Sequence, residues 1–339
     1  MNIIERNFFR LLRAGVFQQE EHIEPISAWK WRQLYAKATS LQLSALLHDG
    51  VTACSSQFFM QLPEDLAATW QQAAEAAEAK HRQASSEVAE LMGLLGTMQM
   101  RPILLEPWAS VGLYPHPEHC VSARVAIYFP YETQGHKADE WAKANGSRHD
   151  DSHKHILTYQ WKSLDVEHRH RMFLLSNKLN NMTLQGIIEH EWLEGGTSHV
   201  VLDGQRIETV APTLAMLTAL LSIVKTTINE GLHLWQILDL GIMLRQQGQL
   251  VDFVKLQGWI ERLHFGRMAQ HIGLILTGLL GFSVDETPFM RPEEADADSL
   301  AGELLGENAR PTKYIRYYPS ESIASVMSSI THSLGNVQE

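Results

Sequence analysis

The sequence has few cysteines, no long apolar run and no excess of basic residues. Its 339 residues include two cysteines, Cys54 and Cys120, which are too few for a disulfide framework or a zinc ribbon and fit a reducing compartment. The most apolar windows, residues 213–224 and 271–282, are about a dozen residues long, whereas a bilayer span needs roughly 20. We therefore expect no membrane partner.

Charge and composition narrow the function classes further. Lys and Arg number 28 against 39 Asp and Glu, a formal net charge of −11. We therefore do not expect a general affinity for nucleic-acid phosphates, although the net charge does not exclude a local basic pocket. Residues 1–6 lack the basic and apolar regions of a signal peptide, so we expect a cytoplasmic protein. With 45% hydrophobic and 20% charged residues, the chain has the composition of a globular protein with one large or two medium domains.

Two strand patterns, residues 103–105 and 125–129, enclose a segment that is rich in Pro, Gly and His. Short β-forming runs around a turn-rich stretch are typical of strands that flank a site loop. In the second run, positions 124, 126 and 128 share one face, because successive strand side chains point to opposite sides. We expect any chemistry to lie on that face.

This segment resembles the uncharacterised bacterial nucleotidyltransferases of the polymerase-beta-like superfamily. Their pattern reads L-L-K-G, then Y-P-x-P, then R-x-x-G-D-I-D-L. Here residues 104–107 read LLEP, residues 114–117 read YPHP and residues 120–126 read CVSARVA. The resemblance covers most of the chain, but its specific part is this segment. It places the two metal-binding aspartates of the family at Arg124 and Ala126.

The family's reaction needs oxygen ligands that these two residues do not provide. Nucleotidyl transfer uses Mg²⁺ to bridge phosphate oxygens to carboxylates at strand positions i and i+2. Arg124 has only N–H donors and stays protonated, and Ala126 has no ligand atom. Pro107 replaces a glycine whose N–H would approach the triphosphate, and Glu106 reverses the sign of the usual lysine. We therefore expect no cofactor and no metal at the family site, with Mg²⁺ as the cofactor if the family activity survives.

Residues 164–170, LDVEHRH, carry the candidate for a remaining catalytic acid. The resemblance implies a third carboxylate just before a histidine, which favours Glu167 over Asp165. Arg124 would then form an ion pair with one of these acids in place of the metal. His168 and His170 share a strand face, and they either bind a ligand or are polar positions beside a cleft.

A polar segment at residues 148–155 carries five side chains of metal-ligand type, namely His149, Asp150, Asp151, His153 and His155, of which the three histidines are the candidate ligands. Together with the two histidines of residues 164–170, they are alternative ligands for zinc or another transition metal. Their spacing matches no standard ligand signature, so we expect a solvated polar turn instead.

Three further positions are candidate ligand contacts. Tyr114 and Tyr128 can stack on a base, although aromatic side chains in such loops more often pack on the sheet, which is our expectation. The resemblance also implies a site residue at Asp239, whereas Thr226 and Trp235 stand where relatives carry a histidine and an arginine.

The hydrophobic pattern predicts both helices and strands, and the resemblance implies an α+β fold, a nucleotidyltransferase-like mixed sheet with N-terminal helices and a C-terminal helical bundle. Helices are predicted at residues 2–12, 27–47, 64–98 and 131–146, and in three or four pieces over 212–281. Further strands are predicted at 155–161 and 164–170, and in a hairpin at 198–208 that turns through Asp-Gly. The expected regions are an N-terminal helical part (1–98), the α/β core (99–211), the bundle (212–290), and a tail (291–339) made of a mobile acidic linker at 291–310 and a last helix at 319–334.

Three functional hypotheses follow. The first is a degenerate nucleotidyltransferase-fold protein that binds a nucleotide or a protein or small-molecule partner. The second is an active nucleotidyltransferase that modifies a small molecule or a protein through a rebuilt metal site. The third is a structural interaction protein.

Overall fold

The computed structural model describes residues 1–121, 124–153, 155–289, 296–305, 318 and 321–322. The chain divides into two compact units. The first contains Met1–Met172 and Thr197–Ala211, and the second contains Phe173–Gly196 and the described part of Pro212–Glu339. The N-terminal helices thus belong to the same unit as the sheet.

Three helices begin the first unit: α1 (Ile3–Phe17), α2 (Ala28–Ser40) and α3 (Ser44–Ala53). The single helix expected at residues 27–47 is two helices, because the chain turns at Gln42, whose φ of 59° is not helical. α1 and α3 pack closely. A Cβ on Gly50 would lie 2.0 Å from the carbonyl oxygen of Leu11, so this contact requires glycine.

The long helix α4 (Glu64–Thr97) confirms the helix predicted at residues 64–98. Leu66 and Trp70 lie on one stripe of this helix and are both buried. The indole N–H of Trp70 donates to the carbonyl oxygen of Ser44 at 2.8 Å, which attaches α4 to α3. Burial of these apolar side chains explains the stripe without any ligand.

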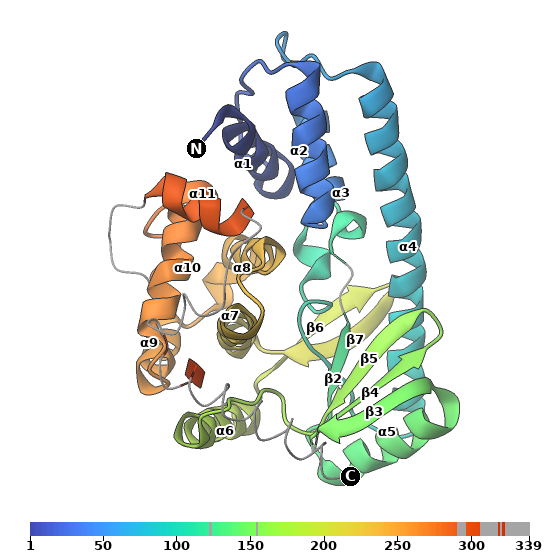
Figure 1. Cartoon of the computed structure of the whole chain (residues 1–339). Helices are drawn as coiled ribbons and strands as arrows, with labels where there is room; N and C mark the ends of the chain where they lie inside the picture. The colour runs from blue at the N-terminus through green and yellow to red at the C-terminus, as the bar shows by residue number, and fades with distance from the viewer. Residues whose placement is uncertain (122–123, 154, 290–295, 306–317, 319–320, 323–339) are drawn as a thin grey trace, which may run out of the picture. The chain divides into compact units, whose positions relative to one another are not determined.

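In the part of the chain that the structure describes, seven strands form one mixed sheet in the order β3-β4-β5-β2-β1-β7-β6 (Figure 1). The strands are β1 (Ile103–Leu104), β2 (Val125–Tyr128), β3 (Ser147–His153), β4 (Ile156–Trp161), β5 (Leu164–Arg169), β6 (Thr197–Leu202) and β7 (Gln205–Val210). β2 lies between β1, to which it is antiparallel, and β5, to which it is parallel. The predicted strands and hairpin are confirmed. Asp203 and Gly204 both have positive φ, as a primed two-residue turn requires.

Residues 147–153 form an edge strand and not the polar turn that the sequence suggested. β3 pairs antiparallel with β4 in an irregular register, and the described side chains of Ser147 to Ser152 are exposed. A strand exposed on both sides lacks the apolar alternation by which strands are recognised. An irregular, charged edge also resists pairing with another chain.

Helix α5 (Glu132–Asn145), predicted at residues 131–146, packs on one face of β4 and β5. That face is apolar and buried, with Leu157, Tyr159 and Val166 among its members. Because side chains alternate along a strand, residues 165, 167 and 169 of β5 lie on the opposite face. Only candidate residues on the same face of the sheet can contribute to one site.

The second unit is helical in its described part. Its helices are α6 (Lys178–Leu193), α7 (Pro212–Asn229), α8 (Leu234–Gln247), α9 (Phe253–Arg262), α10 (Gly266–Leu279) and α11 (Ala297–Leu305). The prediction of three or four helical pieces over residues 212–281 is confirmed by α7, α8, α9 and α10.

The prediction of a mobile linker at residues 291–310 is wrong for residues 297–305. They form α11, whose Leu300, Ala301 and Leu304 are buried, so this acidic segment has an apolar side that packs. The rest of the expected linker, and the helix expected at 319–334 apart from residues 321–322, lie outside the described residues.

A buried histidine connects three segments of the first unit. Nδ1 of His119 lies 2.7 Å from Asp49 Oδ1 in α3, and its Nε2 lies 3.2 Å from Glu78 Oε1 in α4. Burial on its own would lower the pKa of His119, but the two carboxylates raise it above the ordinary value. The His119 ring therefore joins both helices to the loop that follows β1, and its contacts with the carboxylates are strongest when it is protonated.

We predict that His119→Ala lowers the free energy of unfolding by about 2–4 kcal/mol near pH 6, because two carboxylates lose a buried charged partner. A group whose pKa is raised by folding contributes its full stability below its unfolded pKa of about 6.5 and loses it as the pH rises through the folded pKa. The difference from the wild type, measured by urea unfolding, should therefore shrink towards pH 9. Exposed His22 supplies the control variant His22→Ala. A difference that stays constant or grows with pH would contradict this assignment.

Candidate functional site

Glu167 is held between two arginines on the face of the sheet opposite α5. Arg124 Nη1 lies 3.5 Å from Glu167 Oε2, and Arg169 Nε lies 2.5 Å from Oε1. The glutamate side chain is 11% exposed, while that of Arg124 is 53% exposed. Each carboxylate oxygen thus has its own guanidinium, which offsets the cost of burying the charge.

The strand register places Ala126 directly beside this carboxylate. β2 and β5 are parallel, and Ala126 pairs with Glu167, so the two side chains share a face. Asp165 lies on the same face two residues earlier, is exposed, and pairs with Gln160 of β4. At this point the site presents a guanidinium, a methyl group and a paired carboxylate.

The loop that follows β1 begins at the same place. The N–H of Leu105 donates to the carbonyl oxygen of Ala126 at 2.9 Å, so the next two residues, Glu106 and Pro107, start beside the β2 residue that replaces an aspartate. Both are half-buried, and the peptide bond between them is cis. Pro107 has no N–H to offer a phosphate here.

The two tyrosines differ in their surroundings. Tyr114 is 5% exposed, as expected of an aromatic side chain that packs in the loop. Tyr128 is half-buried on the face of Ala126 and pairs with Arg169. Burial raises the pKa of Tyr128, with Arg171 acting in the opposite direction, so its hydroxyl stays protonated at neutral pH.

His168 and His170 lie on the opposite face from Glu167, towards α5. The hydroxyl of Tyr159 lies 2.9 Å from His168 Nε2, and His168 Nδ1 lies 3.2 Å from Asp139 Oδ1. Burial lowers the pKa of His168, so the ring is neutral. It then accepts from Tyr159 and donates to Asp139.

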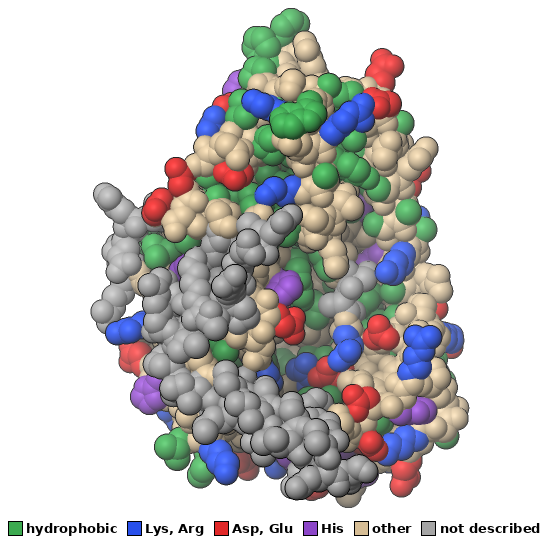
Figure 2. Space-filling view, in the orientation of Figure 1, with side chains coloured by type: hydrophobic (Ala, Val, Ile, Leu, Met, Phe, Trp, Pro, Cys, Tyr) green, Lys and Arg blue, Asp and Glu red, His purple; other side chains and the backbone are tan. Residues whose placement is uncertain are grey.

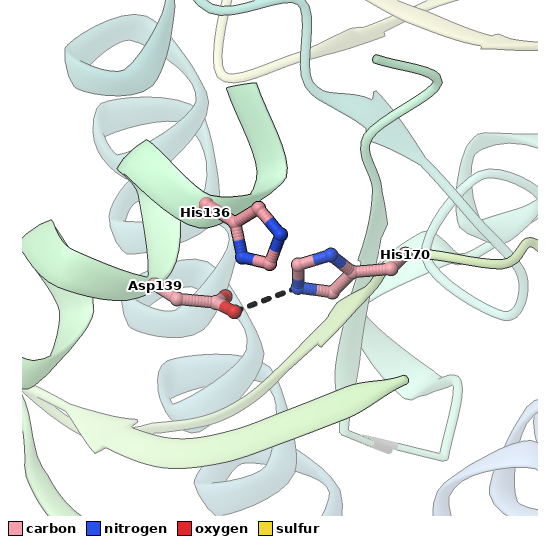
Figure 3. A group of neighbouring side chains, drawn as sticks. All are labelled: His136, Asp139 and His170. Atoms are coloured by element: carbon pink, nitrogen blue, oxygen red, sulfur yellow. Dashed lines mark hydrogen bonds and ion pairs between the residues drawn. The ribbon is translucent and has the colours of Figure 1, made fainter. Parts of the chain in front are cut away.

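Asp139, on α5, also contacts His170. Nε2 of His170 lies 2.6 Å from Asp139 Oδ2. Burial on its own would raise the pKa of Asp139, but the contacts with the two histidines lower it to about 2. His136, one turn earlier on α5, stands beside the ring of His170 (Figure 3). Sequence reasoning missed His136 and Asp139, although their i, i+3 spacing on a helix was a usable signal.

The remaining candidates lie on other elements of the chain. His149 is on β3 and lies 3.1 Å from the carbonyl oxygen of Ala142. His155 is half-buried just before β4, and the side chain of His153 lies outside the described part. Asp239 is half-buried on α8, in the helical unit. Among the described residues, potential metal-donor atoms come together in two groups: His136, Asp139 and the candidate His170, and His190, Glu191 and Glu194.

The surface shows mixed charge. On the face drawn in Figure 2, acidic and basic side chains alternate over the described residues and do not gather by sign. Among the described helices, none combines the length and apolar character needed to cross a membrane.

A comparison with curated proteins gives no match. The crystal structure of an antigenic nucleotidyltransferase-like protein from Paracoccidioides brasiliensis aligns with 65% of this chain and 92% of its own, at 12% identity. Its TM-score of 0.35 is too low to establish a shared fold. The model of the family described as "Uncharacterised nucleotidyltransferase" matches residues 27–281. This match spans more than half of the chain, which therefore belongs to that family of nucleotidyltransferases.

Proposed function

We propose that this protein has lost metal-dependent nucleotidyl transfer and acts as a module that binds a nucleotide or another partner. The observation that carries the proposal is the position of Glu167, whose two oxygens are taken by Arg124 and Arg169 beside the methyl group of Ala126. A cation here would need the same oxygens, and it would meet two fixed positive charges within the same small volume.

The chemistry of the arginines favours anion binding over cation binding. Arg124 is about half exposed, at 53%, and a guanidinium has five N–H donors, of which its contact with Glu167 occupies one side. The donors that face solvent can reach a phosphate oxygen in a bidentate way. A nucleotide phosphate is therefore the ligand that suits this face best.

The proposal predicts no nucleotidyl transfer. Each of the four α-³²P-labelled ribonucleoside triphosphates, incubated with Mg²⁺ or Mn²⁺ and a mixture of protein and small-molecule acceptors, should give no label above the Glu167→Gln variant. Without two carboxylates, the metal cannot neutralise the charge that develops on pyrophosphate. Incorporation by the wild type that Glu167→Gln abolishes would overturn the proposal.

Restoring the two missing carboxylates should create a metal site. In the double variant Arg124→Asp/Ala126→Asp, three carboxylates would share one face and repel each other until a cation binds. We expect Mn²⁺ to raise its melting temperature by several degrees more than that of the wild type. The triple variant that also carries Glu167→Gln is the control and should lose most of this gain. Equal Mn²⁺ shifts in the wild type and the double variant would contradict the assignment of this face.

Nucleotide binding should depend on Arg124. Arg124→Ala removes the exposed guanidinium, so we expect a roughly tenfold weaker nucleotide affinity, equivalent to about 1.4 kcal/mol. Thermal shifts with nucleoside mono-, di- and triphosphates measure this effect. Arg32, whose side chain is 52% exposed and paired with Asp65, provides the matched control Arg32→Ala. Shifts that are absent in the wild type, or equal in both variants, would favour an interaction protein.

A further inference from the structure

A second cluster of polar side chains lies on the face of the sheet towards α5, opposite Glu167. His136 and Asp139 lie one turn apart on α5, and His170 follows the last residue of β5. One ligand atom from each of the three lies within 4.8 Å of the other two. Figure 3 shows the carboxylate and both imidazole rings turned towards a common point.

We propose that His136, Asp139 and His170 form a binding site for a borderline transition-metal dication, with Zn²⁺ as the best fit. Two imidazole nitrogens and one carboxylate oxygen are the donor set that Zn²⁺ accepts, whereas Mg²⁺ and Ca²⁺ require more oxygen ligands. The site is independent of the proposed function, since it lies on the opposite face of β5.

The distances are compatible with a metal after small side-chain rotations. In a tetrahedral zinc site with bonds of 2.0–2.1 Å, neighbouring ligand atoms stand about 3.3 Å apart. His170 Nε2 and Asp139 Oδ2 are 2.6 Å apart, so they separate slightly when a cation replaces the proton between them. His136 has a side chain that is 65% exposed, so its ring can rotate inward.

The second oxygen of Asp139 is already positioned by a buried support. His168 Nδ1 lies 3.2 Å from Asp139 Oδ1, and the Tyr159 hydroxyl fixes the other nitrogen of His168 at 2.9 Å. His168 is fully buried, so this chain holds the carboxylate in one orientation. Hydrogen bonds of this kind orient metal ligands in proteins.

The backbone of α5 leaves room for the ring of His170. A Cβ on Gly135 would lie 3.0 Å from His170 Nδ1 and 3.1 Å from its Cε1, so a larger residue would push the ring away. Glu132 Oε1 lies 3.8 Å from His136 Nε2 and can supply a fourth ligand. A water molecule can take that position as well, because the cluster opens to solvent at His136.

The other donor group, on α6, does not support the same inference. Glu191 and Glu194 hold the ammonium of Lys255 at 2.8 Å and 3.1 Å. A cation is therefore already present between these carboxylates, and a metal would have to displace it. No such cation lies among the contacts described for His136, Asp139 and His170.

The test is titration of the chelator-treated full chain with Zn²⁺ by calorimetry, with Co²⁺ absorbance as a second readout of coordination. We expect one ion per chain, a rise in melting temperature with Zn²⁺, and at least tenfold weaker binding in His136→Ala. This variant is chosen because His136 is exposed, so the fold should survive its loss. Exposed His22 again gives the control, and His22→Ala should bind as the wild type does.

Several results would overturn the proposal: no stoichiometric Zn²⁺ binding, unchanged affinity in His136→Ala, or equal losses in both variants. Binding that is lost in His149→Ala but kept in His136→Ala would place the metal at the polar segment of β3 and also overturn it. Circular dichroism of each variant confirms that a loss of affinity does not come from unfolding.

Discussion

The buried carboxylate of Glu167 is neutralised by two guanidinium groups, those of Arg124 and Arg169. A carboxylate that is 11% exposed needs compensation, because burying an unpaired charge costs several kcal/mol. A divalent cation is one way to provide it, and guanidinium groups are another. In this chain Arg124 and Arg169 contact the carboxylate, and a divalent cation at the same carboxylate would be repelled by both guanidinium groups.

The strand geometry separates the polar residues of β5 into two groups with different chemistry. Glu167 and Arg169 face one side with Ala126, whereas His168 faces α5 and bonds to Asp139. The first group is an ion pair with an exposed arginine, which suits an anion. The second combines imidazoles with a carboxylate, which suits a cation. The same strand thus carries two polar groups on opposite faces of the sheet.

Much of the fold could be predicted because its local signals agree with its tertiary structure. Asp203-Gly204 between two alternating runs favours a primed two-residue turn. The apolar periodicity of the α4 and α7 segments predicts helices. β3 could not be recognised, since it is exposed on both sides and its neighbours decide its conformation. The apolar side of α11 was hidden within an acidic composition, because only a few residues, including Leu300 and Ala301, carry it.

The candidate site was partly accessible from the sequence. The resemblance identified Arg124, Ala126 and Glu167, and the register of β2 and β5 brings them together. The alternation of side chains along β5 is enough to predict that Arg169 shares a face with Glu167 and that His168 lies on the opposite face. The cluster of His136, Asp139 and His170 could not be predicted from local sequence patterns. It depends on how α5 is rotated relative to the end of β5, and tertiary packing determines this rotation.

A crystal structure of the protein grown with Mn²⁺ and a non-hydrolysable nucleoside triphosphate, with anomalous data collected for manganese, would show whether Glu167 binds a metal ion. We expect no manganese peak between Ala126 and Glu167, with Arg124 still within ion-pair distance of the carboxylate. A manganese ion bound to Glu167 at about 2.0–2.3 Å, with Arg124 turned away, would contradict this expectation.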